Sequence, residues 1–313
     1  MLELKGKYNS CKVFTDNIDN ETISQLTNLL NQEFVSDSQV SIMTDCLPSY
    51  TEVLTISGFK SITELSLNDK VANYDMETGK ISFSNIKTLI HRPLRSNEVV
   101  YDFKCRQSNF TISMTENHRV PLSTKVTILA KDLPECSVLH DFIYFGDGCI
   151  SNDICTKYSD LEIKLICWIV GDGNIRNNGN DTYRVRFGFK KERKIKRLCK
   201  LLDEAGLAYY YAEEWRGDTS ITLNTESSEY LLKLIDYNKE FPLDFIRLDK
   251  HQAEIFMEEL IFIDGDWTNY SNKGVYRFNS TSKSSIDIAQ AIFCINGNLA
   301  KYAYRTHSVN RTE

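Results

Sequence analysis

The alternation of apolar and polar residues divides the chain into three parts. Before residue 45, an apolar run at 11–14 predicts a strand, and apolar residues at helical spacing over 22–34 predict a helix. From 46 to about 140, short apolar runs recur around polar turns such as Ser57-Gly58, as in a domain made of hairpins. From about residue 155 onward, the apolar residues take the spacing of helices.

The helix-led part contains the same order of elements twice. A predicted helix ends at Asp172-Gly173, and a later one, over 256–263, ends in the same pair at Asp264-Gly265. After each comes a strand, and then a further helix that stops at glycine. The two copies are separated by 92 residues between Asp172 and Asp264, 93 between Tyr183 and Tyr276, and 91 between Gly206 and Gly297. This nearly constant offset indicates a tandem duplication.

The two Asp-Gly pairs indicate a metal site. Helices that pack as a pair bring their last residues together, and two carboxylates at close range repel each other unless a cation lies between them. Mg²⁺ prefers oxygen ligands, and carboxylate-held Mg²⁺ beside a phosphate is a recurring arrangement for phosphodiester cleavage. One Asp-Gly alone is more often an ordinary helix end, but the duplication favours Asp172 and Asp264 as paired metal ligands.

Basic residues gather after the first Asp-Gly pair. Between Arg184 and Lys200 there are nine Lys or Arg and one acid, Glu192. In the alternating strand 182–189, Arg184 and Arg186 share one face, which suits contact with DNA phosphates along a groove. The charges over 191–197 are instead interpreted as a solvated helix face.

Composition narrows the possible classes of protein. The length of 313 residues suggests two or three domains, and 42% hydrophobic with 26% charged residues excludes general disorder. A net charge of −6 excludes a wholly basic nucleic-acid binder but not a local basic face. We expect no membrane span and no secretory signal, because no apolar stretch is long enough. The nine Cys without C-x-x-C predict reduced thiols of a cytoplasmic protein, and the scattered His argue against structural zinc.

Residues 165–173 and 257–265 resemble the two motifs of LAGLIDADG homing endonucleases, and 276–283 resembles the stretch that follows the motif in intein-borne members. The resemblance implies that Asp172 and Asp264 bind the catalytic metal, Mg²⁺, and that Arg277, like Arg184 and Arg186, contacts DNA. Two departures occur at the helix seam, where Cys167 and Glu259 replace the usual small residues and Glu259 is expected to weaken pairing. A register with Asp266 as the second acid stays open, although Trp267 then replaces the glycine.

Residues 46–55, with Gly58 just after, resemble the first block of an intein, and 115–118 resembles its T-x-x-H block. The resemblance implies a Hint-like splicing domain in which the Cys46 sulfur attacks the carbonyl of Asp45 and gives a thioester. It assigns protonation of the departing amide nitrogen to His118 and polarisation of that amide to Thr115.

The segment before Cys46 resembles the opening of RtcB-type RNA ligases, at 5–9, 12–17 and 42–45. The terminal His-Asn block of inteins is absent from 306–313, so the chain is interpreted as a fragment. The expected fold is multidomain, with an all-β Hint-like domain, α+β LAGLIDADG repeats and a short α/β host fragment. The expected domains are a host segment at 1–45, a splicing region at 46–150, a first endonuclease repeat at 151–250 and an incomplete second repeat at 251–313.

The leading functional hypothesis is an intein precursor fragment that combines the N-terminal acyl shift of splicing with Mg²⁺-dependent cleavage of double-stranded DNA. Its expected partner is the uninterrupted host gene, and the chain is expected to act as a monomer in the cytoplasm. One alternative is an RNA ligase precursor, which would need RNA, metal and the missing downstream sequence. Another is a remnant that binds DNA without cutting it.

Overall fold

The computed structural model places two compact units, Met1–Thr44 and Asp45–Glu313. In the first, strand β1 (Leu2–Lys5) pairs antiparallel with β2 (Ser10–Val13), which confirms the strand predicted near 11–14. The helix predicted over 22–34 and Cys46 lie outside the described residues. The structure describes 2–5, 10–13 and 47–300, apart from 91, 95, 105–110, 123–125, 134–145, 178, 180–181, 214–216, 271–272 and 299.

In the strand-rich part of the second unit, the described pairs between named strands are antiparallel, as the hairpin pattern predicts, and Ile81 adds one parallel bridge to Cys149. Four strands form a sheet in the order β4-β3-β5-β6, and two further antiparallel pairs, β7-β8 and β9-β10, follow this sheet in the sequence. The strands are β3 (Glu52–Thr55), β4 (Gly58–Ser61), β5 (Lys70–Tyr74), β6 (Ile81–Asn85), β7 (Val100–Lys104), β8 (Thr111–Thr115), β9 (Arg119–Pro121) and β10 (Thr127–Leu129).

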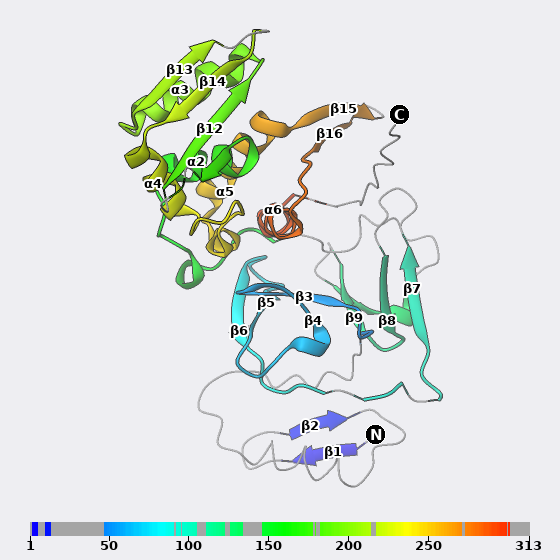
Figure 1. Ribbon diagram of the computed structural model, residues 1–313. Coiled ribbons are helices and arrows are strands. Elements are labelled where there is room, and N and C mark those ends of the chain that lie inside the picture. The colour runs from blue at the N-terminus through cyan, green and yellow to red at the C-terminus, as the bar shows by residue number, and fades with distance from the viewer. Residues whose placement is uncertain are drawn as a thin grey trace, which may run out of the picture. The chain divides into compact units, whose positions relative to one another are not determined.

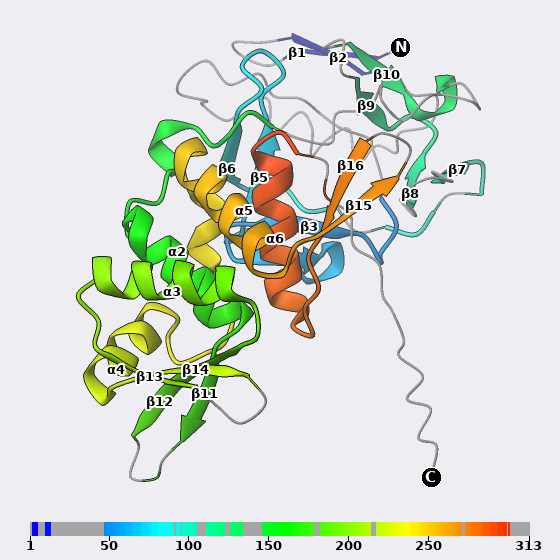
Figure 2. The same cartoon turned by 90° about the horizontal axis from the view of Figure 1, so that it is seen from above.

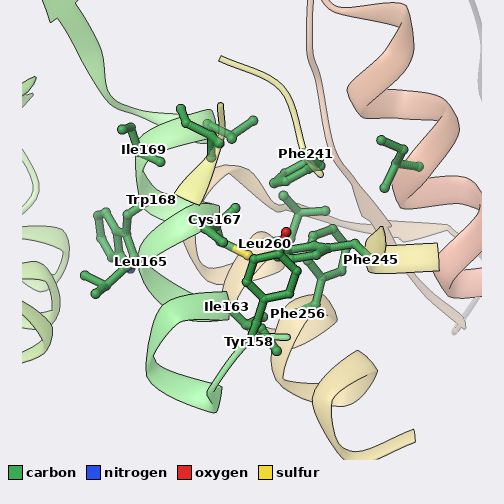
Figure 3. Close-up of a cluster of buried hydrophobic side chains, with 14 of the residues drawn as sticks. Tyr158, Ile163, Leu165, Cys167, Trp168, Ile169, Phe241, Phe245, Phe256 and Leu260 are labelled. Carbon is green, nitrogen blue, oxygen red and sulfur yellow. The ribbon is translucent and has the colours of Figure 1, made fainter. Parts of the chain in front are cut away.

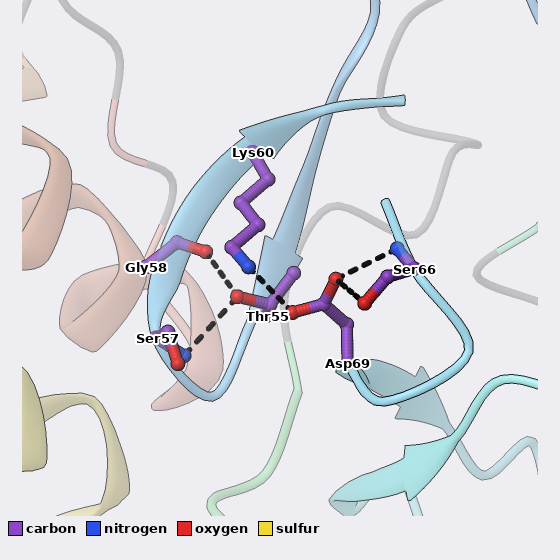
Figure 4. A network of polar contacts seen from close by, with 6 residues as sticks. All are labelled: Thr55, Ser57, Gly58, Lys60, Ser66 and Asp69. Atoms are coloured by element: carbon purple, nitrogen blue, oxygen red, sulfur yellow. Dashed lines mark hydrogen bonds and ion pairs between the residues drawn. The ribbon is translucent and has the colours of Figure 1, made fainter. Parts of the chain in front are cut away.

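The first hairpin turn is held by local hydrogen bonds (Figure 4). The buried Thr55 hydroxyl donates to the carbonyl of Gly58 at 2.7 Å and accepts from the backbone N–H of Ser57 at 3.1 Å. Gly58 has φ +95°, a conformation that favours glycine, so the Ser57-Gly58 turn predicted from the sequence has a steric reason. Beside it, Lys60 donates to Asp69 at 2.5 Å and holds the pKa of that carboxyl below its usual value.

The helix-led part is mixed α and β, and its element order α-β-β-α occurs twice (Figure 1). In the first copy, the strands form an antiparallel sheet in the order β11-β12-β14-β13. The first copy comprises α2 (Asp160–Gly171), β11 (Asn174–Asn177), β12 (Tyr183–Phe189), α3 (Glu192–Glu204), β13 (Tyr209–Glu213), β14 (Thr219–Leu223) and α4 (Thr225–Leu234). The second comprises α5 (Lys250–Asp264), β15 (Asp266–Tyr270), β16 (Lys273–Arg277) and α6 (Lys283–Ile295).

Polar residues set where these helices begin. Four of them start after a residue whose side chain accepts a hydrogen bond from a backbone N–H of the first turn, which satisfies a group that the helix itself cannot pair. At α2, Ser159 and Glu162 exchange such bonds in both directions. The four capping residues are Ser159, Asn224, Asp249 and Ser282. Short 3₁₀ turns occur at Ile62–Glu64, Ala130–Asp132, Ser151–Asp153 and Leu243–Arg247.

Helix α2 lies at the centre of the main core. Its residues from Ile163 to Val170, Lys164 apart, are at most 8% exposed, because α5 covers one side and the sheet with α3 and α4 covers the others. A helix that is apolar almost all round is expected in such a position. Aromatic side chains fill the space beyond the helix pair, with Phe241 and Phe245 packed edge-on against Phe256 (Figure 3).

The segment 146–150, at the boundary expected near residue 150, joins the sheet of β3–β6 to helix α6. Gly146 and Gly148 donate backbone hydrogen bonds to the last carbonyls of α6, each at 2.8 Å, and Asp147 donates to Gly79. Ile81 of β6 exchanges bonds with Gly148 and Ile150. This segment is therefore an ordered connection between the two parts.

Among the described residues, none of the helices combines the length and the apolar character that a membrane span requires.

Candidate functional site

Helices α2 and α5 pack side by side and run in the same direction (Figures 2 and 3). Near their starts, Asp160 contacts His251, with 2.9 Å between Oδ2 and Nε2. Near their ends, the Trp168 indole N–H donates to Glu259 at 2.7 Å. Because starts meet starts and ends meet ends, both helices finish at the same end of the pair. The backbones of Asp172 and Asp264 lie there.

Asp172 is the C-cap of α2, and its side chain is 20% exposed. Its Oδ2 lies 2.6 Å from the Nζ of Lys194, which is itself only 11% exposed. Asp264 is the last residue of α5, and its side chain lies outside the described residues. The pairing of the two carboxylates therefore stays a prediction that the parallel helices support.

The same steric constraint requires glycine after Asp172 and after Asp264. A Cβ on Gly173 would stand 2.5 Å from the carbonyl oxygen of Ile169, and one on Gly265 would stand closer still to that of Ile261. In both copies, the chain leaves the helix so tightly against the preceding turn that no side chain fits. The shared Asp-Gly pair thus fixes how the chain passes from each acid into the next strand.

We expect Gly173→Ala to destabilise the fold, because the colliding atoms are backbone and cannot rotate away. The decrease should be about 1–3 kcal/mol in the free energy of unfolding, the usual range for overpacking, measured by urea denaturation followed by circular dichroism. Gly188→Ala is the control, since a Cβ there meets nothing within 4 Å in an exposed strand position. Equal stability of the two variants would contradict the close approach at Gly173.

Helix α3 lies against the ends of both motif helices, which corrects the expectation of a solvated face over 191–197. Arg193 donates to the carbonyl of Phe262 at 2.7 Å and stacks on its ring. Lys194 binds Asp172, and Arg197 binds Glu259. Arg197 lies four positions after Arg193 and three after Lys194, so it shares a side of the helix with each of them. Lys191 and Lys196 are exposed, and Lys196 pairs with Glu192 on the surface, so these two residues behave as the sequence analysis expects of solvated charges.

Glu259 is 1% exposed and has three hydrogen-bond donors. Its Oε1 accepts from Trp168 at 2.7 Å and from the Nε of Arg197 at 3.3 Å, and its Oε2 accepts from Nη2 of Arg197 at 2.7 Å. The hydrogen bond to Glu259 raises the pKa of Arg197. Burial raises the pKa of the Cys167 thiol well above its ordinary value, and the negative charge of Glu259 adds to this rise. The expected weakening of the helix pair at Glu259 is thus offset by a complete set of partners.

The sheet of the first copy has one buried and one open face. Val185, Phe187 and Phe189 point to the helices and are at most 4% exposed. On the other face, Arg184 is exposed and Arg186 is half-buried, as the alternation predicts. The strand register places Asn174, Arg186, Thr222 and Tyr210 in one row across all four strands, and Arg176 opposite Arg184.

Sequence reasoning missed Arg176 and Tyr210 on this open face. Arg176 is exposed in β11, and Tyr210 is 65% exposed in the edge strand β13. Alternation within 174–177 could have indicated Arg176, whereas Tyr210 joins Arg186 only through the pairing of both strands with β14. Arg277 ends β16 opposite Asp266, and its side chain lies outside the described residues.

Thr115 and His118 lie together in one turn at the end of β8. The backbone N–H of His118 donates to the carbonyl of Thr115 at 2.9 Å, and Thr115 is 5% exposed. Cys46 lies outside the described residues, but the next residue, Leu47, packs against the small core of Met114, Val120 and Ala130. The chain next to Cys46 therefore reaches the same hairpins that carry Thr115 and His118.

The donor set at the helix ends suits a hard cation. Asp172 offers a partly exposed carboxylate at the place where α2 and α5 finish, and carboxylate oxygens are preferred ligands of Mg²⁺. No cluster of three or more His, Cys, Asp or Glu side chains with the geometry of a metal site occurs among the described residues.

The scan against protein-family models found no match for this chain. A curated relative, the ribonucleoside-diphosphate reductase subunit beta of Aquifex aeolicus (strain VF5), is 26% identical over 291 residues, covering 80% of this chain. The chain spans only 40% of the length of that relative. The name of this relative does not describe an RNA ligase, so the resemblance of 1–45 to such ligases stays a prediction.

Solved structures similar to this chain are of LAGLIDADG proteins. I-DmoI in complex with DNA and Mn is 17% identical, with a TM-score of 0.32 over 43% of this chain and 76% of that one. The N-terminal LAGLIDADG domain of WhiA is 12% identical, with a TM-score of 0.22 over 45% and 85%. The homing endonuclease I-WcaI bound to its DNA recognition sequence is 14% identical, with a TM-score of 0.18 over 54% and 92%.

Proposed function

We propose that the chain carries a metal-dependent endonuclease that cuts double-stranded DNA. The observation that carries this proposal is the parallel packing of α2 and α5, which ends both helices at one place with an Asp-Gly pair in each. The open sheet face with Arg176, Arg184 and Arg186 belongs to the same repeat. An acidic helix end suits a metal ion that acts on a phosphate, and a basic sheet face suits contact with the DNA backbone.

Asp172 and Asp264 would hold the metal, for which we propose Mg²⁺. Such an ion, when bound, supplies Lewis-acid polarisation of a phosphate oxygen and lowers the pKa of a bound water. Lys194 orients the Asp172 carboxylate from α3, and its charge favours an approaching phosphate. Arg193 and Arg197 hold α3 against the end of α5, so that Lys194 keeps this position.

The open sheet face would follow the DNA backbone. The whole chain has a net charge of −6, so attraction to DNA must come from a local surface. The guanidinium groups of Arg184 and Arg186 can each donate two parallel hydrogen bonds to one phosphate. Asn174 and Tyr210, which lie in the row of Arg186 across the sheet, offer hydrogen-bonding groups to base edges.

The double variant Arg184→Ala/Arg186→Ala should bind duplex DNA of arbitrary sequence at least about tenfold more weakly, because phosphate contacts dominate such binding. The slope of log affinity against log salt should become shallower by about 0.9 for each phosphate that the variant no longer neutralises. Fluorescence anisotropy over a salt series measures both. Lys196→Ala, which removes a surface charge paired with Glu192, is the control and should leave the slope unchanged. A double variant with the slope of the unmodified chain would exclude this face as the interface.

We further propose that residues 46–150 form a Hint-like region that starts protein splicing. The packing of Leu47 beside Met114 and the turn that joins Thr115 to His118 support this proposal. In the first step the Cys46 thiol releases its proton to solvent, its sulfur bonds to the carbonyl carbon of Asp45, and the bond from that carbon to the Cys46 nitrogen breaks. His118 gives the nitrogen its proton, and a thioester links the two parts.

The match to a reductase subunit favours an inserted element. The similarity covers most of this chain but less than half of a protein whose name describes a different enzyme. A segment shared in this way is expected when the same element interrupts different genes. Extending the reading frame tests this, since a His-Asn block followed by host sequence should appear downstream. A remnant that binds DNA without cutting it is the alternative, and DNA binding without Mg²⁺-dependent cleavage would favour it.

A further inference from the structure

We propose that Glu259 is a positioning residue, which together with Trp168 and Arg197 fixes the register of the two motif helices and thereby the separation of Asp172 and Asp264. This inference rests on the proposed nuclease function. It concerns a residue type that is out of place at a seam between helices, where a charge is costly unless it is paired.

The geometry of Glu259 ties three helices together. The carboxylate belongs to α5, the Trp168 indole that binds it belongs to α2, and the Arg197 guanidinium belongs to α3. Both oxygens are used, and the group is 1% exposed. A carboxylate in such a position cannot be satisfied by water, so it holds the two motif helices at the one offset where all its donors are in reach.

A small slide would change the active site. An α-helix rises about 1.5 Å per residue, so moving α5 by one residue against α2 would shift the two acids by that distance. A metal ion accepts ligand distances within only a few tenths of an ångström, so such a slide would remove one ligand. The Trp168–Glu259 bond lies one turn from Asp172, where it restrains this motion most directly.

Helix α3 extends the same restraint to the acid itself. Arg197 binds Glu259, Arg193 binds the carbonyl of Phe262, and Lys194 binds Asp172, all from adjacent turns. The end of α5 and the carboxylate of α2 are thus held by one rigid element. Removal of the Glu259 charge would free Arg197 and loosen α3 at the position that orients Asp172.

The test compares Glu259→Gln with Glu258→Gln in the full chain. The first replaces one carboxylate oxygen by an N–H group that faces the donors of Arg197, whereas the second removes the same charge from an exposed neighbour on the same helix. Calorimetric titration with Ca²⁺ measures metal binding without cleavage. We expect Glu259→Gln to weaken Ca²⁺ binding at least about tenfold, the effect of outer contacts that orient ligands, and Glu258→Gln to leave it unchanged.

A second readout follows the register itself, at the far end of the helix pair. The contact with Asp160 raises the pKa of His251 above its ordinary value, with smaller contributions from Asp249 and Glu254. A slide of α5 breaks this contact, so the NMR-measured pKa of His251 should fall in Glu259→Gln and stay raised in Glu258→Gln. Circular dichroism confirms that both variants are folded.

The outcomes separate the two proposals. A folded Glu259→Gln with unchanged Ca²⁺ affinity and unchanged His251 pKa overturns the positioning role and leaves the nuclease proposal standing. An unmodified chain that binds no Ca²⁺ overturns the metal site, and the His251 pKa then still decides whether Glu259 fixes the register. A variant that loses stability alone, with both readouts unchanged, shows that Glu259 serves only the fold.

Discussion

Asp172→Asn should abolish Mg²⁺-dependent cutting of duplex DNA while DNA binding stays within about twofold of the unmodified protein, because binding depends on phosphate contacts elsewhere. The amide has the shape of the carboxylate but no charge, so it cannot hold a divalent ion against water. Removal of Lewis-acid stabilisation worth several kcal/mol corresponds to a fall in rate of at least about 100-fold. Single-turnover cleavage of a plasmid that carries the uninterrupted host gene measures it, with EDTA as the blank.

Two control variants distinguish the role of the metal in cleavage from the role of the ion pair between Asp172 and Lys194. Glu254→Gln removes an exposed charge from α5 and should cut normally. Lys194→Met keeps Asp172 as a ligand but removes the group that orients it at 2.6 Å, so it should cut more slowly and recover in part at higher Mg²⁺. An Asp172→Asn variant that cuts at the normal rate would remove this acid from the reaction, and Asp266 would then become the acid to test in the second copy.

The repeat was predictable because it depends on local order. Apolar spacing marks each helix, alternation marks the strand that carries Arg184 and Arg186, and the constant offset links the two copies without any knowledge of their packing. The structure confirms a helix, a strand and a further helix in each copy and the alternation of exposure along β12, and it adds one strand to each copy, β11 and β15, that the sequence analysis did not predict. The hairpins of the region before residue 130 were predictable for the same reason, since each strand pairs with a near neighbour in the chain.

Contacts between distant elements were not predictable. The run 191–197 contains five cations, and nothing local distinguishes Lys194, which meets Asp172, from Lys196, which lies on the surface. Glu259 has the polarity of an exposed residue, yet it is buried because Trp168 and Arg197 supply its donors from two other helices. The partners of such side chains depend on how the helices pack, and the sequence pattern shows only which face of each helix is apolar.

The open sheet face also combines features that the local sequence predicts with features that depend on distant elements. Pairing of β11 with β12 is a hairpin, so the row of Arg176 and Arg184 follows from the local sequence. The row that joins Arg186 to Tyr210 crosses β14, which lies between β12 and β13 although it follows both in the chain. The base-reading part of the proposed interface therefore depends on strand order, while its phosphate-binding part depends on alternation.

Cys46→Ala should abolish release of the first 45 residues when a small thiol is added to the purified chain. The added thiol exchanges with the thioester that the acyl shift forms, and alanine has no sulfur to form it. Because the thioester is reversible, the thiol draws the reaction forward, and mass spectrometry should detect the segment as its thiol ester. His118→Ala should slow release of the same product, since the amide nitrogen then lacks its proton donor.

The control is a cysteine that takes no part in the shift. Cys167 is buried between the motif helices, and its pKa is raised, so Cys167→Ala should release the segment at the normal rate. Release that continues in Cys46→Ala would identify ordinary proteolysis and end the splicing proposal, while the nuclease proposal would be unaffected. If release needs Cys46 but does not depend on His118, the thioester step stands and another group must donate the proton. That group is expected near the Thr115 turn, where Leu47 packs against Met114.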